Sequence, residues 1–378
     1  MKTSKLYDQI IIGGGPAGST MATSLATKGQ KVLVLEKEKF PRPHVGESLL
    51  PFTYQIFEEL GVLEDMKKQF SRKPGVTFSN IDGSDASHWC FKQVIKDESA
   101  LSFHVRRAPF DDLLLQNSRN KGAEVIEEIR VLQVDLSDPH KAVVIGQNHE
   151  GKEQVFEAKF VVDASGQSTL LANQMKTKKA FDSLQPRVAY STHWQNAQLS
   201  PDLAAGNIKI VHLEGQKTGW FWMIPLQDRL SIGVALDMEY ANQQRRILKD
   251  TTDDWQTALY MQELAASPVA QAAIAGATRM RPVAANGDFS YYAKTKWGTN
   301  FAIVGDASGF LDPIFSSGIY LGMKSSLLVS EGITELLSGK GTASIEQAYH
   351  NISGAYRLVE KLINTFYEPG SIKFDQLG

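Results

Sequence analysis

The sequence predicts an α/β protein: a dinucleotide-binding domain of parallel strands and helices, interrupted by an antiparallel sheet and followed by C-terminal helices. Three observations predict this class. A glycine-rich turn at residues 13–18 lies between two short apolar runs, as in a β-α-β unit. Four β-rich runs follow one another between residues 187 and 236. Apolar side chains then recur at helical spacing from Ser344 to Tyr367.

Composition narrows the class of protein. The 378 residues are enough for more than one domain, and the net charge of −2 gives no basic footprint for nucleic acid or an anionic membrane. The single cysteine, Cys90, excludes an internal disulfide and a Cys-x-x-Cys redox pair, so redox chemistry requires a cofactor. No apolar run is long enough to span a bilayer, and no signal peptide is evident. We therefore expect a cytoplasmic protein.

The first β-α-β unit is complete in the sequence. A strand, Tyr7–Ile12, leads into the glycine turn, a helical stretch covers Ser19–Thr27, and a second buried strand, Lys31–Leu35, ends in Glu36. This acid follows the first glycine by about 20 residues, the spacing at which a carboxylate accepts ribose hydroxyls. The order strand, turn, helix, strand and acid predicts a Rossmann-like fold.

Each residue of the turn has a mechanical role. Gly13 makes the tight turn, Gly15 lets backbone amides approach a pyrophosphate, and Gly18 lets helix and strand pack closely. Pro16 and Ala17 lie at the start of the helix, whose unpaired amides face the phosphates.

Four further segments resemble those that contact FAD in glutathione-reductase-like flavoproteins, a superfamily that includes the aromatic hydroxylases. They are Phe40–Ser48, Val105–Asp111, Phe160–Gly166 and Phe301–Ala307. The resemblance implies FAD contacts from Arg42, Ser48, Arg107, Asp163, Gly166 and Asp306. No second glycine fingerprint follows for a nicotinamide cofactor, so we expect a separate flavin reductase to supply reduced FAD.

An aromatic strand carries the most specific signal. Trp220 and Trp222 are spaced i, i+2, so both indoles lie on one face, and Pro225 ends the strand because it lacks a donor. The string Trp-x-Trp-x-Ile-Pro resembles the signature of the flavin-dependent halogenases. The resemblance implies that these three residues form a wall between a substrate and the flavin. It also implies use of reduced FAD, dioxygen and chloride or bromide to make hypohalous acid.

A lysine is the candidate catalytic residue. Phenol- and pyrrole-type halogenases carry a Lys-x-Gly-Ala-x-Phe string whose lysine is catalytic, and Lys73 occupies that place. The match departs from the family at Val76, where alanine is usual, and at Ser79 and Asn80, where an aromatic residue is common. A charged lysine would hydrogen-bond the oxidant, and a neutral lysine would form an N–halogen bond. The sequence leaves both routes open.

The loop before the last long helical patterns gives a candidate halide site. It resembles the Asp-Pro-x-Phe-Ser-Ser-Gly loop of the halogenases, so backbone amides around Ser317 and Gly318 are expected to bind halide, with Gly318 also near the flavin. Tryptophan-type halogenases have a glutamate just before this element, where this chain has Phe315. We therefore expect a phenolic or pyrrolic substrate rather than free tryptophan. The resemblance implies that Phe315, like the two tryptophans and Pro225, belongs to the substrate pocket and its barrier to the flavin.

These segments predict the domain organisation. The FAD domain is expected to be discontinuous, the antiparallel sheet to form a substrate domain that roofs the flavin, and the rest to be a short helical tail. The expected ranges are 1–80, 100–175 and 285–340 for the first, 176–284 for the second and 341–378 for the third. The expected strands of the second domain are Arg187–Gln195, Asn207–Leu213, Gly219–Pro225 and Arg229–Leu236, with a helix over Asp253–Ala275. Because many halogenases have a longer C-terminal region over the substrate, we expect an open site and an aromatic unit tethered to a carrier protein.

Three alternatives remain open from the sequence: a geranylgeranyl-reductase-type enzyme, a flavin monooxygenase, and a flavoprotein that has lost catalysis. Ile224 and Lys73 disfavour the first, and Ser308 stands where aromatic hydroxylases have a histidine. No metal-ligand set or Ser-His-Asp triad is evident. The scattered histidines are expected to be structural; they are His44, His88, His104 and His212.

Overall fold

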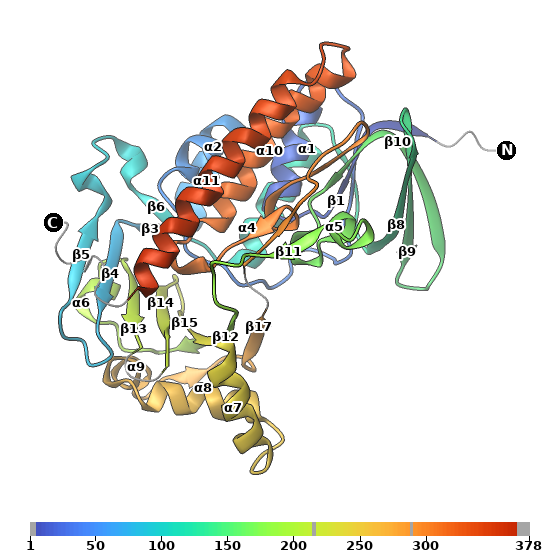
Figure 1. The fold of residues 1–378 in the computed structure, drawn as a ribbon. Helices are drawn as coiled ribbons and strands as arrows, with labels where there is room; N and C mark the ends of the chain where they lie inside the picture. Colours follow the sequence, from blue (N-terminus) through green and yellow to red (C-terminus); the bar gives the residue numbers. More distant parts are fainter. Residues whose placement is uncertain (1–4, 214–216, 288–289, 369–378) are drawn as a thin grey trace.

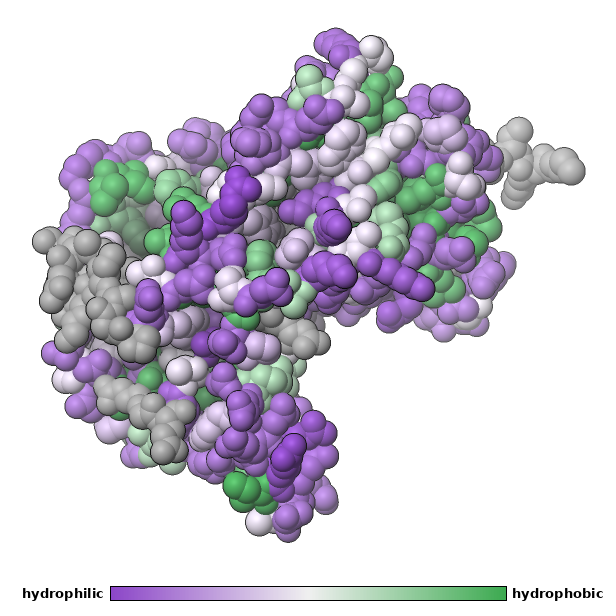
Figure 2. Space-filling view, viewed as in Figure 1, coloured by the Kyte–Doolittle hydropathy of each residue, from purple (hydrophilic) through white to green (hydrophobic). Residues whose placement is uncertain are grey.

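The computed structural model describes residues 5–213, 217–287 and 290–368. Figure 1 shows two lobes: a larger one built on a mostly parallel sheet, and a smaller one built on a second sheet with helices on its outer side. The face in Figure 2 is mostly hydrophilic and is indented where the lobes meet.

Five parallel strands form the centre of the larger lobe, in the order β7-β2-β1-β10-β19. They are β1 (Leu6–Ile12), β2 (Val32–Leu35), β7 (Glu124–Ile126), β10 (Glu153–Asp163) and β19 (Phe301–Ile303). The first half of β10 pairs instead with an antiparallel hairpin of β8 (Ile129–Asp138) and β9 (Lys141–Asn148). The predicted Rossmann-like unit is therefore confirmed, with Ile12 and Asp163 side by side at its carboxyl edge.

Helices cover this sheet. The helix α1 (Pro16–Thr27) contacts α4 (Arg107–Asn120) and α10 (Gly318–Leu337), and α10 contacts α11 (Ala343–Tyr367). The opposite face of the sheet packs against the β8–β9 hairpin. The short elements around them are α2 (Thr53–Leu60), α3 (Leu63–Gln69), β3 (Ser71–Lys73), β6 (Ser102–His104), α5 (Leu170–Gln174), β11 (Lys178–Ala180), α6 (Pro201–Ala204), β18 (Tyr291–Ala293) and β20 (Gly309–Phe310).

The second sheet has the order β16-β12-β15-β14-β13-β4-β5, with β17 also paired to β12. Its strands are β4 (Gly75–Ser79), β5 (Ser87–Cys90), β12 (Arg187–Gln195), β13 (Ile208–His212), β14 (Gly219–Pro225), β15 (Leu230–Asp237), β16 (Thr278–Arg279) and β17 (Ala284–Gly287). Apart from the parallel pair β13–β4, these neighbours are antiparallel. The four strands expected here are all present, two of them with the expected bounds.

The second sheet takes strands from outside its expected range. β4 lies within 1–80, the first segment expected for the FAD domain, yet it pairs with β13, and β5 pairs with β4. By hydrogen bonding, the second sheet therefore begins at Gly75, because the edge of β13 is completed by chain from the N-terminal segment. The remaining domain limits stay a proposal.

Three helices cover the outer face of the second sheet: α7 (Met238–Lys249), α8 (Trp255–Ala265) and α9 (Pro268–Ile274). The expected single helix over 253–275 is wrong, because it breaks between α8 and α9. Pro268 lacks an amide donor, and Ser267 Oγ accepts from Ala270 N at 3.2 Å as the N-cap of α9.

The last helix, α11, joins the lobes. Figure 1 shows it crossing from the upper lobe down to β13 and β14. Tyr349 Oη donates to Ile303 O at 2.9 Å, and Tyr356 Oη donates to Gly309 O at 2.7 Å. At the far end, the Phe366 ring stacks on His212 of the second sheet. In the part of the chain that the structure describes, every helix is too short or too polar to cross a bilayer.

Candidate active site

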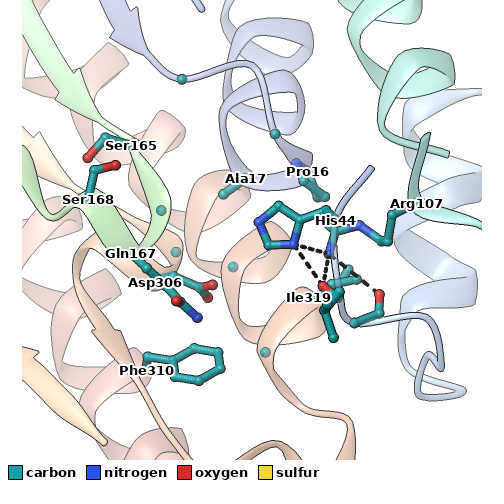
Figure 3. Close-up of a pocket in the computed structure, with 18 of the residues that line it drawn as sticks. Pro16, Ala17, His44, Arg107, Ser165, Gln167, Ser168, Asp306, Phe310 and Ile319 are labelled. Atoms are coloured by element: carbon teal, nitrogen blue, oxygen red, sulfur yellow. Dashed lines mark hydrogen bonds between the residues drawn. The ribbon is translucent and has the colours of Figure 1, made fainter. Parts of the chain in front are cut away.

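One cavity of about 460 Å³ lies where the two lobes meet. The start of α1, the loop from Arg42 to Ser48, the turn after β10 and the start of α10 line it from the larger lobe, and β14 lines it from the second sheet. Figure 3 shows Ser165, Gln167, Ser168 and Asp306 on one side, with His44 and Arg107 across from them.

The glycine turn has the geometry that a bound dinucleotide requires. Gly13 has φ +102°, and a Cβ there would lie 2.4 Å from Ala164 O. A Cβ on Gly18 would lie 1.9 Å from Gly13 O, so this glycine packs helix against strand. No side chain caps α1, so its first amides are free to receive a phosphate at the cavity wall formed by Gly15, Pro16 and Ala17.

Glu36 lies where the sequence predicts it. Its carboxylate is buried at the cavity wall and accepts from the amides of Gly14 at 2.7 Å and Glu38 at 2.9 Å. These bonds fix the orientation of the carboxylate and leave it acceptor capacity for a ribose hydroxyl. The turn and this acid together fit the adenosine and pyrophosphate parts of FAD.

A buried charge network supports the opposite wall. Arg107 Nε and Nη2 donate to both oxygens of Asp111 at 2.7 and 2.8 Å, and Arg42 Nη1 adds a bond of 2.8 Å. Arg107 Nη1 also donates to Val45 O at 2.7 Å, which fixes the loop around the cavity. His44 was expected to be structural, but its side chain also lines the cavity. The positive charge of Arg107, together with burial, lowers the pKa of His44 to about 4.

Asp306 lies at the cavity between Gly305 and the start of α10. Burial raises the pKa of Asp306 to about 6, although the positive charge of Arg107 opposes the shift. A ligand that donates a hydrogen bond here would relieve the cost of burying this carboxylate, as the ribityl hydroxyl of FAD would. Gly318 lines the cavity beside it.

The paired tryptophans form one wall of the cavity. Trp220 and Trp222 both line it, and their ring centroids are 5.5 Å apart. Their cross-strand partners are Ala235 and Gly233, small residues that leave room for the indoles. A Cβ on Gly233 would lie 2.0 Å from the Trp222 ring. The predicted shared face of the two indoles is therefore confirmed.

Several predicted site residues do not line the cavity; they are Gly18, Lys73, Asp163, Pro225, Phe315 and Ser317. Asp163 is the clearest correction. Its two oxygens accept from Ser165 N at 2.9 Å and Leu171 N at 2.7 Å, so it fixes the turn while Ser165 and Gly166 face the cavity. Pro225 ends β14 as expected, and Phe315 packs on Phe366 of α11.

Lys73 lies one layer behind the cavity. Its side chain is buried, and Nζ donates to Leu49 O at 2.9 Å. Leu49 follows Ser48, which lines the cavity, so Lys73 contacts the backbone of the loop that forms this part of the cavity wall. Burial lowers the pKa of Lys73 to about 7.

Glu47 and His193 escaped sequence reasoning. His193 Nε2 lies 2.9 Å from Glu47 Oε1, and Glu47 lines the cavity. The two residues are 146 positions apart, so no local pattern joins them. The sequence signal for Glu47 was its place in Phe40–Ser48, the segment that resembles a FAD-contacting loop. Among the described residues, no group of three or more potential metal ligands is found.

Comparisons with known proteins agree with this geometry. Residues 8–100 and 86–369 match the tryptophan halogenase family. The chain is 32% identical over 372 residues to a tryptophan 2-halogenase of Chondromyces crocatus, covering 96% of this chain and 68% of that protein. It is also 32% identical over 357 residues to a Pseudomonas fluorescens chlorinase of 1H-pyrrole-2-carbonyl on peptidyl-carrier protein, covering 87% and 76%.

A solved structure of the myxobacterial chondrochloren halogenase CndH superposes with a TM-score of 0.86 at 32% identity, covering 98% of this chain and 85% of that one. The fold, the FAD-fitting cavity and these relatives agree, and the reductase and monooxygenase alternatives are excluded. The chain thus belongs to the tryptophan halogenase family, whose members are flavin-dependent halogenases that use FAD and chloride or bromide.

Proposed function

We propose that this enzyme halogenates an electron-rich phenol or pyrrole ring held on a carrier protein, with reduced FAD supplied by a separate flavin reductase. Two relatives support the substrate class, because their names describe a chlorinase and a brominase of 1H-pyrrole-2-carbonyl on peptidyl-carrier protein. Phe315 supports it too, since it stands where tryptophan-type halogenases have a glutamate. Such a ring is activated by its own heteroatom.

The burial of the Lys73 amine is the observation that supports the proposal most strongly. Its burial lowers the pKa to about 7, so near neutral pH the amine is present in both charged and neutral forms. The charged form donates a hydrogen bond to hypohalous acid and polarises its halogen. The neutral form accepts the halogen as an N–halogen bond. Either form would present the halogen to the ring.

Orphaned polar atoms surround Lys73 and support a small polar ligand there. Lys73 pairs with Ser102 between β3 and β6, and Ser48 pairs with His104. Partners in an antiparallel pair, and residues two apart, share a face, so these four side chains point to one side. Ser48 Oγ, Ser102 Oγ and His104 Nδ1 are buried and have no hydrogen-bond partner in the part of the chain that the structure describes. Hypohalous acid would satisfy such groups.

The cavity residues have complementary tasks in this mechanism. FAD, when bound, supplies the two electrons that activate dioxygen. The amide of Gly318, at the uncapped start of α10, holds the halide anion beside it. Trp220 and Trp222 keep the organic ring away from that region, so that only the small oxidant reaches Lys73.

Assays of the Lys73→Met variant distinguish the formation of hypohalous acid from the halogenation of the ring. The protein receives photoreduced FAD, dioxygen and bromide, with a diketone trap for hypohalous acid or with pyrrole-2-carbonyl on a carrier protein. We expect trapped oxidant at the wild-type level and a loss of ring halogenation of about 100-fold or more. Lys68→Met, an exposed lysine of α3, is the matched control.

Free 4-methylphenol and free tryptophan serve as competing substrates. Faster halogenation of tryptophan than of the carrier-bound ring would contradict the proposed substrate class. Ring halogenation by Lys73→Met at the wild-type rate would contradict the role of the lysine.

A further inference from the structure

Glu47 differs from the other acids of the cavity. Glu36, Glu38 and Asp306 also line it, but Glu36 is held by two backbone amides and Glu38 pairs with Arg42. Asp306 lies beside α10, on the side of the flavin expected to receive ribityl hydroxyls. Glu47 is 3% exposed, and one oxygen accepts from His193 while the other has no hydrogen-bond partner among the described residues. It is a carboxylate with one oxygen left for the cavity.

His193 has two distinct ring nitrogens. A carboxylate can only accept, so Nε2 carries the proton and donates to Glu47 Oε1 at 2.9 Å. Nδ1 is then an acceptor, and it is buried without a partner in residues 5–213, 217–287 and 290–368. A ring that takes a proton at one nitrogen and releases one at the other is suited to relay protons. The imidazole is 6% exposed, so the relay site is screened from bulk water.

Positive charges surround this pair. Arg281 Nη2 lies 3.4 Å from His193 Nε2, and because a guanidinium only donates, this contact is electrostatic when Nε2 carries the proton. Arg281 Nε is itself buried without a partner among the described residues. Arg107 and Arg229 also interact electrostatically with Glu47. The nitrogens of His193 and Arg281 that have no partner among the described residues leave hydrogen-bonding capacity open beside the pair. A water there would connect Nδ1 with solvent.

We infer that Glu47 and His193 deliver protons to the flavin cavity while hypohalous acid is formed. In sum, the anionic reduced flavin, dioxygen, halide and two protons give oxidised flavin, hypohalous acid and water. The oxygen–oxygen bond breaks, one oxygen binds the halogen, and the other leaves as water with the delivered protons. Glu47 lines the cavity and would pass the proton to the reacting oxygen, and His193 is a positioning and relay residue. The inference rests on halogenase activity but on neither Lys73 nor the identity of the ring.

The first test uses the protein without FAD. Nitrogen-15 NMR of the histidine rings reports which nitrogen of His193 carries the proton, with His193→Gln used to assign the signal. We expect the proton on Nε2 in the wild type and a changed ring signal in Glu47→Gln. A proton on Nδ1 alone would overturn the inference, because Nε2 could then not pass a proton to Glu47.

The second test measures hypohalous acid with photoreduced FAD, bromide, dioxygen and the diketone trap. For Glu47→Gln we expect trapped oxidant to fall about tenfold or more, with hydrogen peroxide rising in its place. The affinity for FAD, followed by fluorescence quenching, should stay within about twofold of the wild type. His88→Gln, on the exposed strand β5 of the same sheet, should behave as the wild type.

Chemical rescue separates a relay from a merely structural histidine. We expect His193→Gly to regain oxidant formation with added imidazole and to gain nothing from N-methylimidazole, which has one nitrogen blocked. Trapping at the wild-type rate by FAD-bound Glu47→Gln would overturn the inference, as would equal rescue by both imidazoles. A wild type that traps no oxidant would overturn the halogenase assignment as well. One that traps oxidant but halogenates no carrier-bound ring would overturn only the proposed substrate.

Discussion

Lys73 is a charged residue type placed where charge is costly. Its pKa falls from 10.5 to about 7, so between these values the unfolded chain binds a proton that the folded chain does not. Stability therefore rises as pH rises through this window, and the full cost of burial is present at and below about pH 7.

Lys73→Met should accordingly stabilise the protein at neutral pH. The expected gain in the free energy of unfolding is about 5 kcal/mol as an upper limit, from about 1.4 kcal/mol per pKa unit, and it should shrink toward zero above about pH 10. Urea midpoints at about pH 6.5 and about pH 9.5 measure it, with exposed Lys361→Met as the control. A gain independent of pH would show that Lys73 is not titrating in this window.

Asp306→Asn tests the acid at the cavity in the same terms. The pKa of Asp306 is raised from 3.8 to about 6, so the folded state holds a proton that the unfolded state releases, and stability falls as pH rises through that window. The FAD-free variant should be more stable than the wild type at pH 7, by up to about 3 kcal/mol, with the gain vanishing below about pH 4. Its FAD affinity should fall by about tenfold. Unchanged FAD binding would place the ribityl chain elsewhere.

At the level of single elements, the wall of the cavity depends on β15 as much as on β14. Gly233→Ala would place a Cβ 2.0 Å from the Trp222 ring, so the indole must move into the cavity. We expect the free energy of unfolding to fall by about 1–3 kcal/mol and the tryptophan fluorescence to shift. Gly287→Ala on β17 is the matched control, because its Cβ would meet only atoms 3.7 Å away or farther. Equal changes in stability and fluorescence for the two variants would mean that the Trp222 ring is not packed tightly against Gly233.

Elements with strong local signals were predictable from the sequence. β12 and β14 have the expected bounds because their apolar runs are bounded by turn residues or a proline. The helix break at Pro268 was also readable, since Ser-Pro is a common start of a helix, but alanine-rich periodicity on both sides obscured it. The sequence could not show which groups the Asp163 carboxylate binds. The same local sequence allows a turn carboxylate to accept from its own backbone or to bind a ligand.

At the scale of the whole molecule, α11 links the lobes through a buried cluster. Tyr367 Oη donates to Asp312 Oδ2 at 2.8 Å, and the Arg187 guanidinium of β12 lies 3.6 Å from the Tyr367 ring centroid. Tyr367→Phe keeps the ring and removes a donor to a carboxylate that is 2% exposed. We expect the free energy of unfolding to fall by about 1–3 kcal/mol, measured by thermal unfolding. Tyr292→Phe, whose hydroxyl has no hydrogen bond among the described residues, should change little.

Contacts between distant segments were beyond local sequence reasoning. The Glu47–His193 pair joins a loop of the larger lobe to β12, and only the closed fold brings them within 2.9 Å. The sequence identified Lys73 as the candidate catalytic lysine, but it could not show that the amine is buried and donates to Leu49 O. The lowered pKa of Lys73 is caused by its burial, which only the folded chain produces.

The strand β4 also determines whether the smaller lobe can exist alone. A fragment of residues 176–284 would keep β12 to β15 but lose the partner that covers the edge of β13. An uncovered edge of apolar strand, with Ile208 and Ile210 among its buried side chains, is a template for intermolecular pairing. Excised from its parent, the lobe would therefore tend to aggregate, and a soluble version would need Gly75–Cys90 grafted back as its missing border.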